Sequence, residues 1–180
     1  AQTNVDRFKD LPVDAVITDC GSCGVTLGQY GELLNTREAA EFSAKVIDVN
    51  AFLLNNTDFA RGLQAVDGCV TYHDPCHLKR GMKVSGEPRQ ILQSIPGLVF
   101  KEMREADTCC GSAGTFSLTN YPLAMRIADR KITNIAATEA TVVATGCPSC
   151  QMQLRHGLQR HGQAMQVVHP VELLARAYAQ

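Results

Sequence analysis

The chain has 180 residues, of which 45% are hydrophobic and 19% charged, with 17 basic and 18 acidic side chains giving a net charge of −1. This length suffices for an ordinary hydrophobic core, and the composition excludes an intrinsically disordered protein. The balanced charge gives no reason to expect a nucleic-acid partner. The longest apolar runs, such as residues 51–54, fall far short of the ~20 residues of a membrane span, so no transmembrane segment is expected.

The first ten residues contain neither an initiator methionine nor the apolar core of a signal peptide. We therefore expect that residue 1 is either a processed end or the edge of a longer protein. Without a secretion signal, the cysteines are expected to reside in a reducing compartment. The sequence thus predicts a cytoplasmic protein.

Short β-branched runs alternate with segments whose apolar residues recur at helical spacing. Strands are predicted at residues 14–19, 69–73, 98–103 and 141–146, each leading towards a cysteine. Helices are predicted after the first and last of these strands and at residues 37–46, 49–55, 88–94, 122–137 and from about 170. This alternation predicts an α/β fold with a small, largely parallel sheet flanked by helices and built from Rossmann-like strand-Cys-helix units. In such a sheet, sites form outside the carboxyl ends of the strands.

Two of these units resemble each other. Residues 16–27 align without gaps on residues 143–154 with identities at six of the twelve positions, including both cysteines of each Cys-x-x-Cys motif. We interpret this as an internal duplication. The second copy is preceded by Cys76 and the pair Cys109 and Cys110, whereas no cysteine precedes the first copy. Residues 1–60 are therefore predicted to be the C-terminal remnant of a first domain, and residues 61–180 a complete second domain.

Five cysteines form the complete set of the second copy: Cys76, Cys109, Cys110, Cys147 and Cys150. Five thiols exceed the four ligands of a tetrahedral zinc site and of an ordinary cubane cluster. Side chains of consecutive residues in extended backbone point to opposite sides, so the vicinal pair is suited to bind two different metal atoms. This favours a polynuclear iron–sulfur cluster, while structural zinc and a thiol redox centre remain alternatives. Cys20 and Cys23 either belonged with cysteines upstream or serve this second site.

Residues around the cysteines also suit an anionic cofactor. Gly111, Ser112 and Gly114 can form turns that aim backbone N–H groups at one point. Cys147 and Cys150 fall at a predicted helix start, which stabilises thiolates. His73 and His77 bracket Cys76 and can hydrogen-bond a sulfur or replace one as a zinc ligand. Ser22 and Ser149 lie between cysteines with no histidine at a suggestive position, so a serine nucleophile is not predicted.

The segments YHDPCHL, CCGSAGTFSL, ATGCPSCQMQL and VVHPVELL resemble the cysteine-rich CCG domain family. This family includes a subunit of heterodisulfide reductase and the iron–sulfur subunits of glycolate, lactate and anaerobic glycerol-3-phosphate oxidases. The resemblance covers nearly the whole chain and is greatest to the glycolate oxidase iron–sulfur subunit. It implies the C-terminal part of a tandem CCG-domain protein with a non-cubane [4Fe–4S] cluster on the five cysteines. Handling in air would leave the site empty or filled with zinc.

The resemblance further implies an electron-transfer subunit that does not itself carry out catalysis. Its partner would be a flavoprotein 2-hydroxyacid dehydrogenase of glycolate or lactate type, and electrons would pass towards a quinone. Such a complex would place the chain at the inner face of the cell membrane as a peripheral subunit. Two alternatives remain: a cluster that reduces a disulfide substrate directly, and a zinc-stabilised interaction module.

Overall fold

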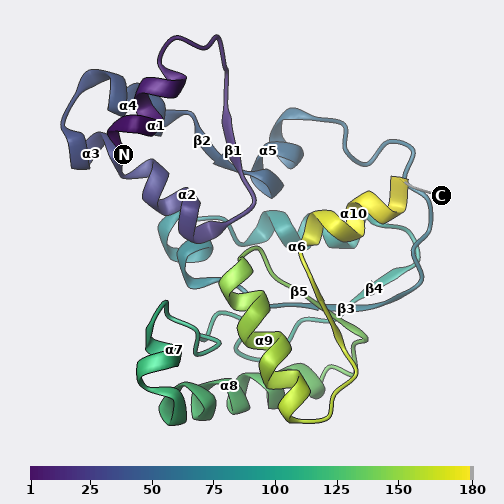
Figure 1. Ribbon diagram of the computed structural model, residues 1–180. Helices are drawn as coiled ribbons and strands as arrows, with labels where there is room; N and C mark the ends of the chain where they lie inside the picture. Colours follow the sequence, from purple (N-terminus) through teal and green to yellow (C-terminus); the bar gives the residue numbers. More distant parts are fainter. Residues whose placement is uncertain (179–180) are drawn as a thin grey trace.

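The centre of the fold is a four-stranded parallel sheet with the strand order β4-β3-β5-β6 (Figure 1). The computed structural model describes residues 1–178; residues 179–180, the end of the predicted second domain, lie outside the described residues. The strands are β3 (Gly68–Tyr72), β4 (Leu98–Phe100), β5 (Val142–Ala144) and β6 (Gln166–Val168). The parallel sheet that the sequence predicted is therefore present.

Helices cover both faces of this sheet because its strands are apolar on both sides. Val142 and Ala144 face α6 (Gly86–Ser94) and α10 (Pro170–Tyr178). Val143, between them in sequence, faces α8 (Tyr121–Ala136) and α9 (Pro148–Arg160). This alternation produces three layers, which confirms the predicted α/β class.

The first third of the chain forms a smaller unit around a two-stranded parallel sheet of β1 (Val16–Thr18) and β2 (Val46–Asp48). Its core includes Val5, Tyr30 and Phe42. The helices of this part are α1 (Gln2–Phe8), α2 (Gly21–Gly28), α3 (Tyr30–Leu34), α4 (Arg37–Ala44) and α5 (Val49–Asn56). Helix α5 packs against α6 and α10, so it joins this unit to the larger sheet.

The two units share a strand-helix-strand-helix order. It is β1-α2-β2-α5 in the first unit, where α3 and α4 are inserted after α2, and β5-α9-β6-α10 in the second. Val16 pairs with Val46 in one sheet, and the aligned Val143 pairs with Val167 in the other. The similarity thus extends beyond the twelve aligned residues. The division at residue 60 stays a prediction.

Several element boundaries differ from the prediction. The helix predicted at residues 37–46 ends at Ala44 because Val46 pairs with Val16 in β2. The strand predicted at 98–103 ends at Phe100, and the chain then turns at Glu105, whose φ is 55°. Three-residue strands such as β2 and β6 are too short for a visible alternation, and they were not predicted.

Three short helical segments were also missed, namely α1, α7 (Phe116–Thr119) and the π-helix η1 (His77–Gly81). The helix expected after the first Cys-x-x-Cys is divided into α2 and α3. Among residues 1–178, no helix combines the length and the apolar character needed to cross a bilayer.

Candidate metal centre

The candidate site lies where the strand order reverses. The chain runs from β3 to β4 in one direction and from β5 to β6 in the other, so β3 and β5 are the neighbours at which the direction changes. Ligands of open parallel sheets bind outside the carboxyl ends of the strands at such a point. His73 directly follows β3, and Cys147 follows β5 after two residues.

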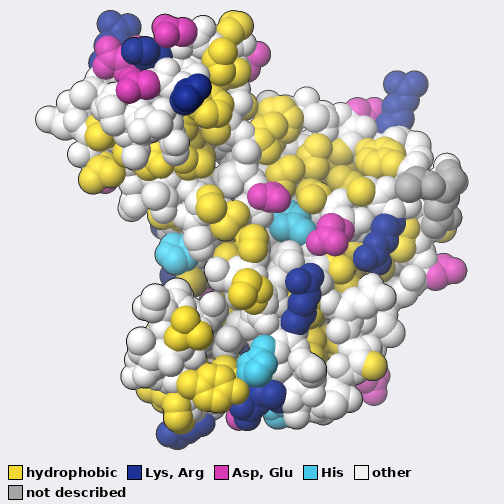
Figure 2. Space-filling view, viewed as in Figure 1, with side chains coloured by type: hydrophobic (Ala, Val, Ile, Leu, Met, Phe, Trp, Pro, Cys, Tyr) yellow, Lys and Arg dark blue, Asp and Glu magenta, His cyan; other side chains and the backbone are white. Residues whose placement is uncertain are grey.

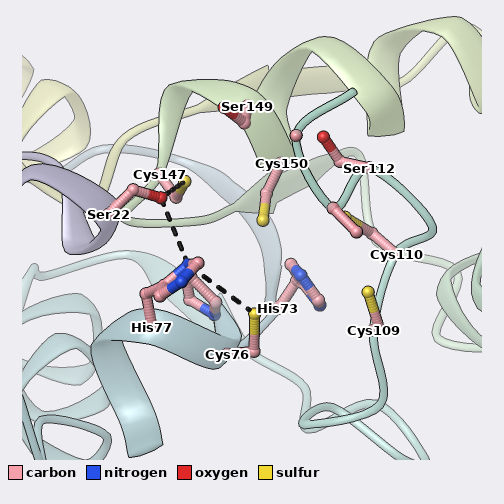
Figure 3. A pocket seen from close by; sticks show the side chains of 13 residues that line it. Ser22, His73, Cys76, His77, Cys109, Cys110, Ser112, Cys147, Ser149 and Cys150 are labelled. Atoms are coloured by element: carbon pink, nitrogen blue, oxygen red, sulfur yellow. Dashed lines mark hydrogen bonds between the residues drawn. The ribbon is translucent and has the colours of Figure 1, made fainter. Parts of the chain in front are cut away.

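All five predicted cysteine ligands line one cavity of about 270 Å³ at this point (Figure 3). They come from three segments: the turn after β3, the loop after β4 and the start of α9. Of the other residues expected to contact a cofactor, Ser112, Gly114 and His77 line the cavity. The lining is completed by Ser22, His73, Pro75, Ala113 and Ser149. The five sulfurs therefore lie around one cavity. That they bind a metal remains a prediction.

The last Cys-x-x-Cys begins a helix, as the sequence predicted. Cys147 is the extended N-cap of α9, with φ −156° and ψ 121°, and Pro148 occupies the first turn. The Cys147 sulfur interacts with the side chain of Cys150 and with the Ser22 hydroxyl, and these interactions lower the pKa of Cys147 to about 5. Cys147 is therefore a thiolate at neutral pH, the form that binds metals.

The vicinal pair contains a second thiolate. Interactions with the sulfurs of Cys109 and Cys150 hold the pKa of the buried Cys110 well below its ordinary value of 9.0. Cys109 and Cys150 both interact with Cys110, and this raises the pKa of each, so they retain their protons. Two thiolates and two thiols therefore lie next to one another, and together they offer sulfur donors to metal cations.

Gly111 supports this pair from outside the cavity. Its φ is 89°, in the left-handed region, and its backbone N–H donates to the Cys109 sulfur at 3.3 Å. A Cβ at this position would lie 2.5 Å from the carbonyl oxygen of Ala124. Gly111 thus turns the chain and aims an N–H at a sulfur, as predicted, although it does not line the cavity.

Helix α8 fixes the loop that carries the pair. The carboxylate of Glu105 accepts hydrogen bonds from Arg130 at 2.6 Å and from Asn134 at 3.1 Å. These bonds lower the pKa of Glu105. Lys131 is buried and donates to the carbonyl oxygens of Glu105 and Ala106. Lys131 therefore lies under the loop after β4, residues 101–115 (the cysteine loop), and burial lowers its pKa.

Ser22 joins the two units at the cavity. Its hydroxyl lies 3.3 Å from Nδ1 of His77 and 3.6 Å from the Cys147 sulfur (Figure 3). The sequence places no histidine at a suggestive position for this serine, but η1 brings His77 to it across 55 residues of sequence. His77 Nδ1 also lies 3.9 Å from the Cys76 sulfur, and its contact with a cofactor stays a prediction.

Cys20 and Cys23 lie beside the cavity without lining it. Cys20 is the N-cap of α2, as Cys147 is of α9, and the Cys20 sulfur accepts from the Cys23 N–H at 3.5 Å. Burial raises the pKa of Cys20 to about 11. The Gly21 N–H donates to the Gly146 carbonyl at 3.2 Å, so the two Cys-x-x-Cys turns touch through their backbones.

An apolar surface borders the site. Leu118 and Met152 line a groove of about 370 Å³ that shares Ser112, Gly114 and Ser149 with the cysteine cavity. Leu118 is 81% exposed and Met152 70% exposed. Figure 2 shows hydrophobic side chains gathered over α7 at the lower left of the molecule. Exposed apolar side chains therefore reach the edge of the candidate metal centre.

Comparison with known proteins gives consistent matches. The family model for a cysteine-rich CCG domain matches residues 1–28 and 70–155. The chain is 41% identical, over 98% of its length, to the probable glycolate oxidase iron–sulfur subunit of Bacillus subtilis, of which it covers 42%. It is 38% identical, over 92% of its length, to a subunit of the fumarate reductase (CoM/CoB) of Methanothermobacter marburgensis, of which it covers 33%.

A third relative is a subunit of the dihydromethanophenazine:CoB–CoM heterodisulfide reductase of Methanosarcina mazei, which is 32% identical over 98% of the chain, with 44% of that protein covered. The chain thus spans less than half the length of each of these three relatives. All three are subunits of oxidoreductases.

Proposed function

Because this chain belongs to the family of cysteine-rich CCG domains, we propose that its cavity holds an iron–sulfur cluster that transfers electrons within an oxidoreductase complex. The observation that carries this proposal is the convergence of five cysteines from three segments on one cavity. Five sulfurs are more than a tetrahedral zinc ion binds. Similarity to a glycolate oxidase iron–sulfur subunit supports the same cofactor.

The cluster would be of the [4Fe–4S] type and non-cubane, held by Cys76, Cys109, Cys110, Cys147 and Cys150. When bound, it supplies a group that accepts and releases single electrons. The thiolates of Cys110 and Cys147 are ready to bind iron. The N–H of Gly111 donates to the Cys109 sulfur and stabilises its anionic form.

The complex would oxidise a 2-hydroxyacid such as glycolate or lactate in a flavoprotein partner, and this chain would pass the electrons towards a quinone. Among the described residues, no lysine or arginine lines the cavity. A hydroxyacid carboxylate would find no cation there, so the substrate would bind to the partner. Membrane association would come through the complex as a peripheral contact.

Residues 1–60 would be the end of a first CCG domain, and residues 61–180 a second. The two segments that match the family each contain one Cys-x-x-Cys motif, and the two units share their topology. In this arrangement, Cys20 and Cys23 would bind a separate cluster together with cysteines outside these 180 residues.

Anaerobic reconstitution with iron and sulfide tests the cofactor. Acid-labile sulfide and iron should be present in equal amounts, and the reduced protein should give an electron paramagnetic resonance signal. The Cys109→Ser variant should lose this signal, whereas Cys69→Ser, on strand β3 outside the cavity, should keep it. One zinc ion per chain without sulfide after reconstitution would refute the proposal.

Direct reduction of a disulfide is the second candidate. The cavity reaches beyond the cysteines to the hydroxyl of Ser22 and the imidazole of His77, which can contact a small molecule next to a cluster. Similarity to a subunit of a heterodisulfide reductase also favours it. Turnover of a disulfide by the reduced holoprotein without a flavoprotein would establish this activity, and no turnover would exclude it for this chain.

A further inference from the structure

His73 has a fixed tautomer. The side chain is 1% exposed, and its Nδ1 lies 3.1 Å from the carbonyl oxygen of Ala106. A carbonyl oxygen only accepts hydrogen bonds, so Nδ1 must carry a proton. In the neutral ring, Nε2 then presents a bare lone pair. Nε2 is buried and has no hydrogen-bond partner among the described residues.

Two cysteine sulfurs lie next to the imidazole ring of His73. A ring nitrogen of His73 and the sulfurs of Cys110 and Cys150 lie within 4.8 Å of one another. Because Nδ1 is bound to Ala106, Nε2 is the nitrogen that remains for a ligand. Tetrahedral zinc, with bonds of about 2.3 Å to sulfur and 2.0 Å to nitrogen, spaces its ligands roughly 3.5–3.8 Å apart. Small side-chain rotations therefore suffice to close the site.

The surroundings hold the imidazole in place. The Ala106 carbonyl accepts hydrogen bonds from Asp74 N at 3.0 Å, His73 Nδ1 at 3.1 Å and Lys131 Nζ at 3.2 Å. Metal-binding histidines commonly donate their second N–H to a backbone carbonyl, which fixes the tautomer and the ring orientation. Figure 3 shows the His73 ring among the cysteine side chains of the cavity.

From this geometry we propose that His73, Cys110 and Cys150 form a mononuclear site for a thiophilic divalent cation, Zn²⁺ or Fe²⁺, in the chain that lacks its cluster. The site uses two of the five cluster sulfurs, so a bound zinc ion competes with cluster assembly. It does not depend on the proposed function, because one ion needs neither sulfide nor Cys76.

Anaerobic titration of the reduced apo-protein with Co²⁺ tests this site. We expect one Co²⁺ per chain, with sulfur-to-metal charge transfer and the ligand-field bands of tetrahedral coordination. In His73→Gln, the side-chain amide can still donate to Ala106 but offers no imidazole. Loss of a hydrogen-bond partner of a metal ligand lowers metal affinity by about 10–100-fold, and loss of the ligand itself should lower it at least as much. His161→Ala and Cys69→Ser, both outside the cavity, should bind as the wild type does.

An unchanged Co²⁺ affinity and spectrum in His73→Gln would overturn the proposal. If circular dichroism shows that this variant is unfolded, X-ray absorption of the Zn²⁺-loaded wild type decides. Scattering from an imidazole supports the site, and a shell of sulfur alone refutes it.

The Cys76→Ser variant separates this site from the proposed cluster. It removes one of the five sulfurs but none of the three ligands, so it should lose the cluster and keep the single Co²⁺. Loss of Co²⁺ binding in this variant would show that the larger sulfur set holds the ion, and would contradict a three-ligand site.

Discussion

Single residues after β4 determine where the vicinal cysteines lie. Glu105 adopts a left-handed conformation with φ 55°, and Gly111 does so with φ 89°. Glu105 accepts hydrogen bonds from Arg130 and Asn134 of α8, which keep its end of the loop in place. The cysteine positions thus depend on residues that themselves bind no metal.

The charge of Glu105 should give the protein an acid-sensitive contribution to stability. Its pKa is lower in the folded chain than its ordinary value of 4.5 because Arg130 donates to it. The folded state therefore binds this proton less readily than the unfolded state, so the stabilisation is present above about pH 4.5 and is lost below it. The melting temperatures of wild type and Glu105→Gln should differ near pH 7 and converge towards about pH 3.

Glu139→Gln is the matched control, because Glu139 is exposed and its ion pair with Lys101 is long, at 3.7 Å. This control should follow the wild type at each pH. A difference between wild type and Glu105→Gln that does not change with pH would exclude the ionised carboxylate as its cause.

Gly111→Ala should destabilise the apo-protein. The left-handed conformation costs a residue with a side chain about 1–2 kcal/mol, and the new Cβ would lie 2.5 Å from the Ala124 carbonyl. Overpacking of this kind adds about 1–3 kcal/mol. Urea unfolding measures the sum. Gly162→Ala, with φ 65° and open space around it, should show only the conformational cost, and equal losses in both variants would argue against the clash.

Helices α8 and α9 are the elements that build the cavity. Ile132 and Ile135 of α8 pack with Leu154 and Leu158 of α9 against one face of the sheet. The N-terminus of α9 then presents Cys147 and Cys150, while α8 supplies the cation of Lys131 under the loop. Apolar packing thus positions the polar groups that surround the sulfurs.

Lys131→Met should loosen the cysteine loop. The Ala106 carbonyl would keep two donors, but the Glu105 carbonyl would lose the ammonium group that binds it. A partly buried carbonyl without a donor costs about 1–3 kcal/mol, and faster hydrogen exchange of the loop amides should accompany this loss. Lys101→Met removes only a surface ion pair and should have little effect. Equal exchange rates in both variants would contradict this role of Lys131.

At the scale of the whole molecule, the two units meet at their Cys-x-x-Cys turns. The backbone bond from Gly21 to Gly146 and the hydroxyl of Ser22 link α2 to the cavity wall. A Cβ at Gly21 would lie 2.8 Å from Cβ of Leu78 in η1 and 2.9 Å from its backbone nitrogen. The close approach of α2 and η1 therefore requires a glycine.

Gly21→Val should push the two units apart. We expect a lower melting temperature and faster proteolysis between residues 57 and 67, the segment that connects α5 to β3. Gly28→Val, at the end of α2 with no atom within 4 Å of a new Cβ, controls for the change in helix propensity. Equal cleavage rates in the two variants would show that the Gly21 contact does not hold the units together.

The sequence by itself determined the fold class, the strand-Cys-helix units and the five cysteines of the cavity. These features follow from local patterns: β-branched runs, helical spacing and cysteines next to strand ends. Val142 to Ala144 and the helix after Cys147 could be recognised because each element carries its own apolar pattern.

The tertiary structure alone decided which distant groups meet. No local pattern links Ser22 to His77, Lys131 to Ala106, or the nitrogen of His73 to two sulfurs. These contacts arise because the strand order reverses between β3 and β5, so that segments far apart in sequence end at the same edge of the sheet. The tertiary structure also decided the short strands β2 and β6, because these strands are defined by their pairing with β1 and β5 rather than by intrinsic propensity.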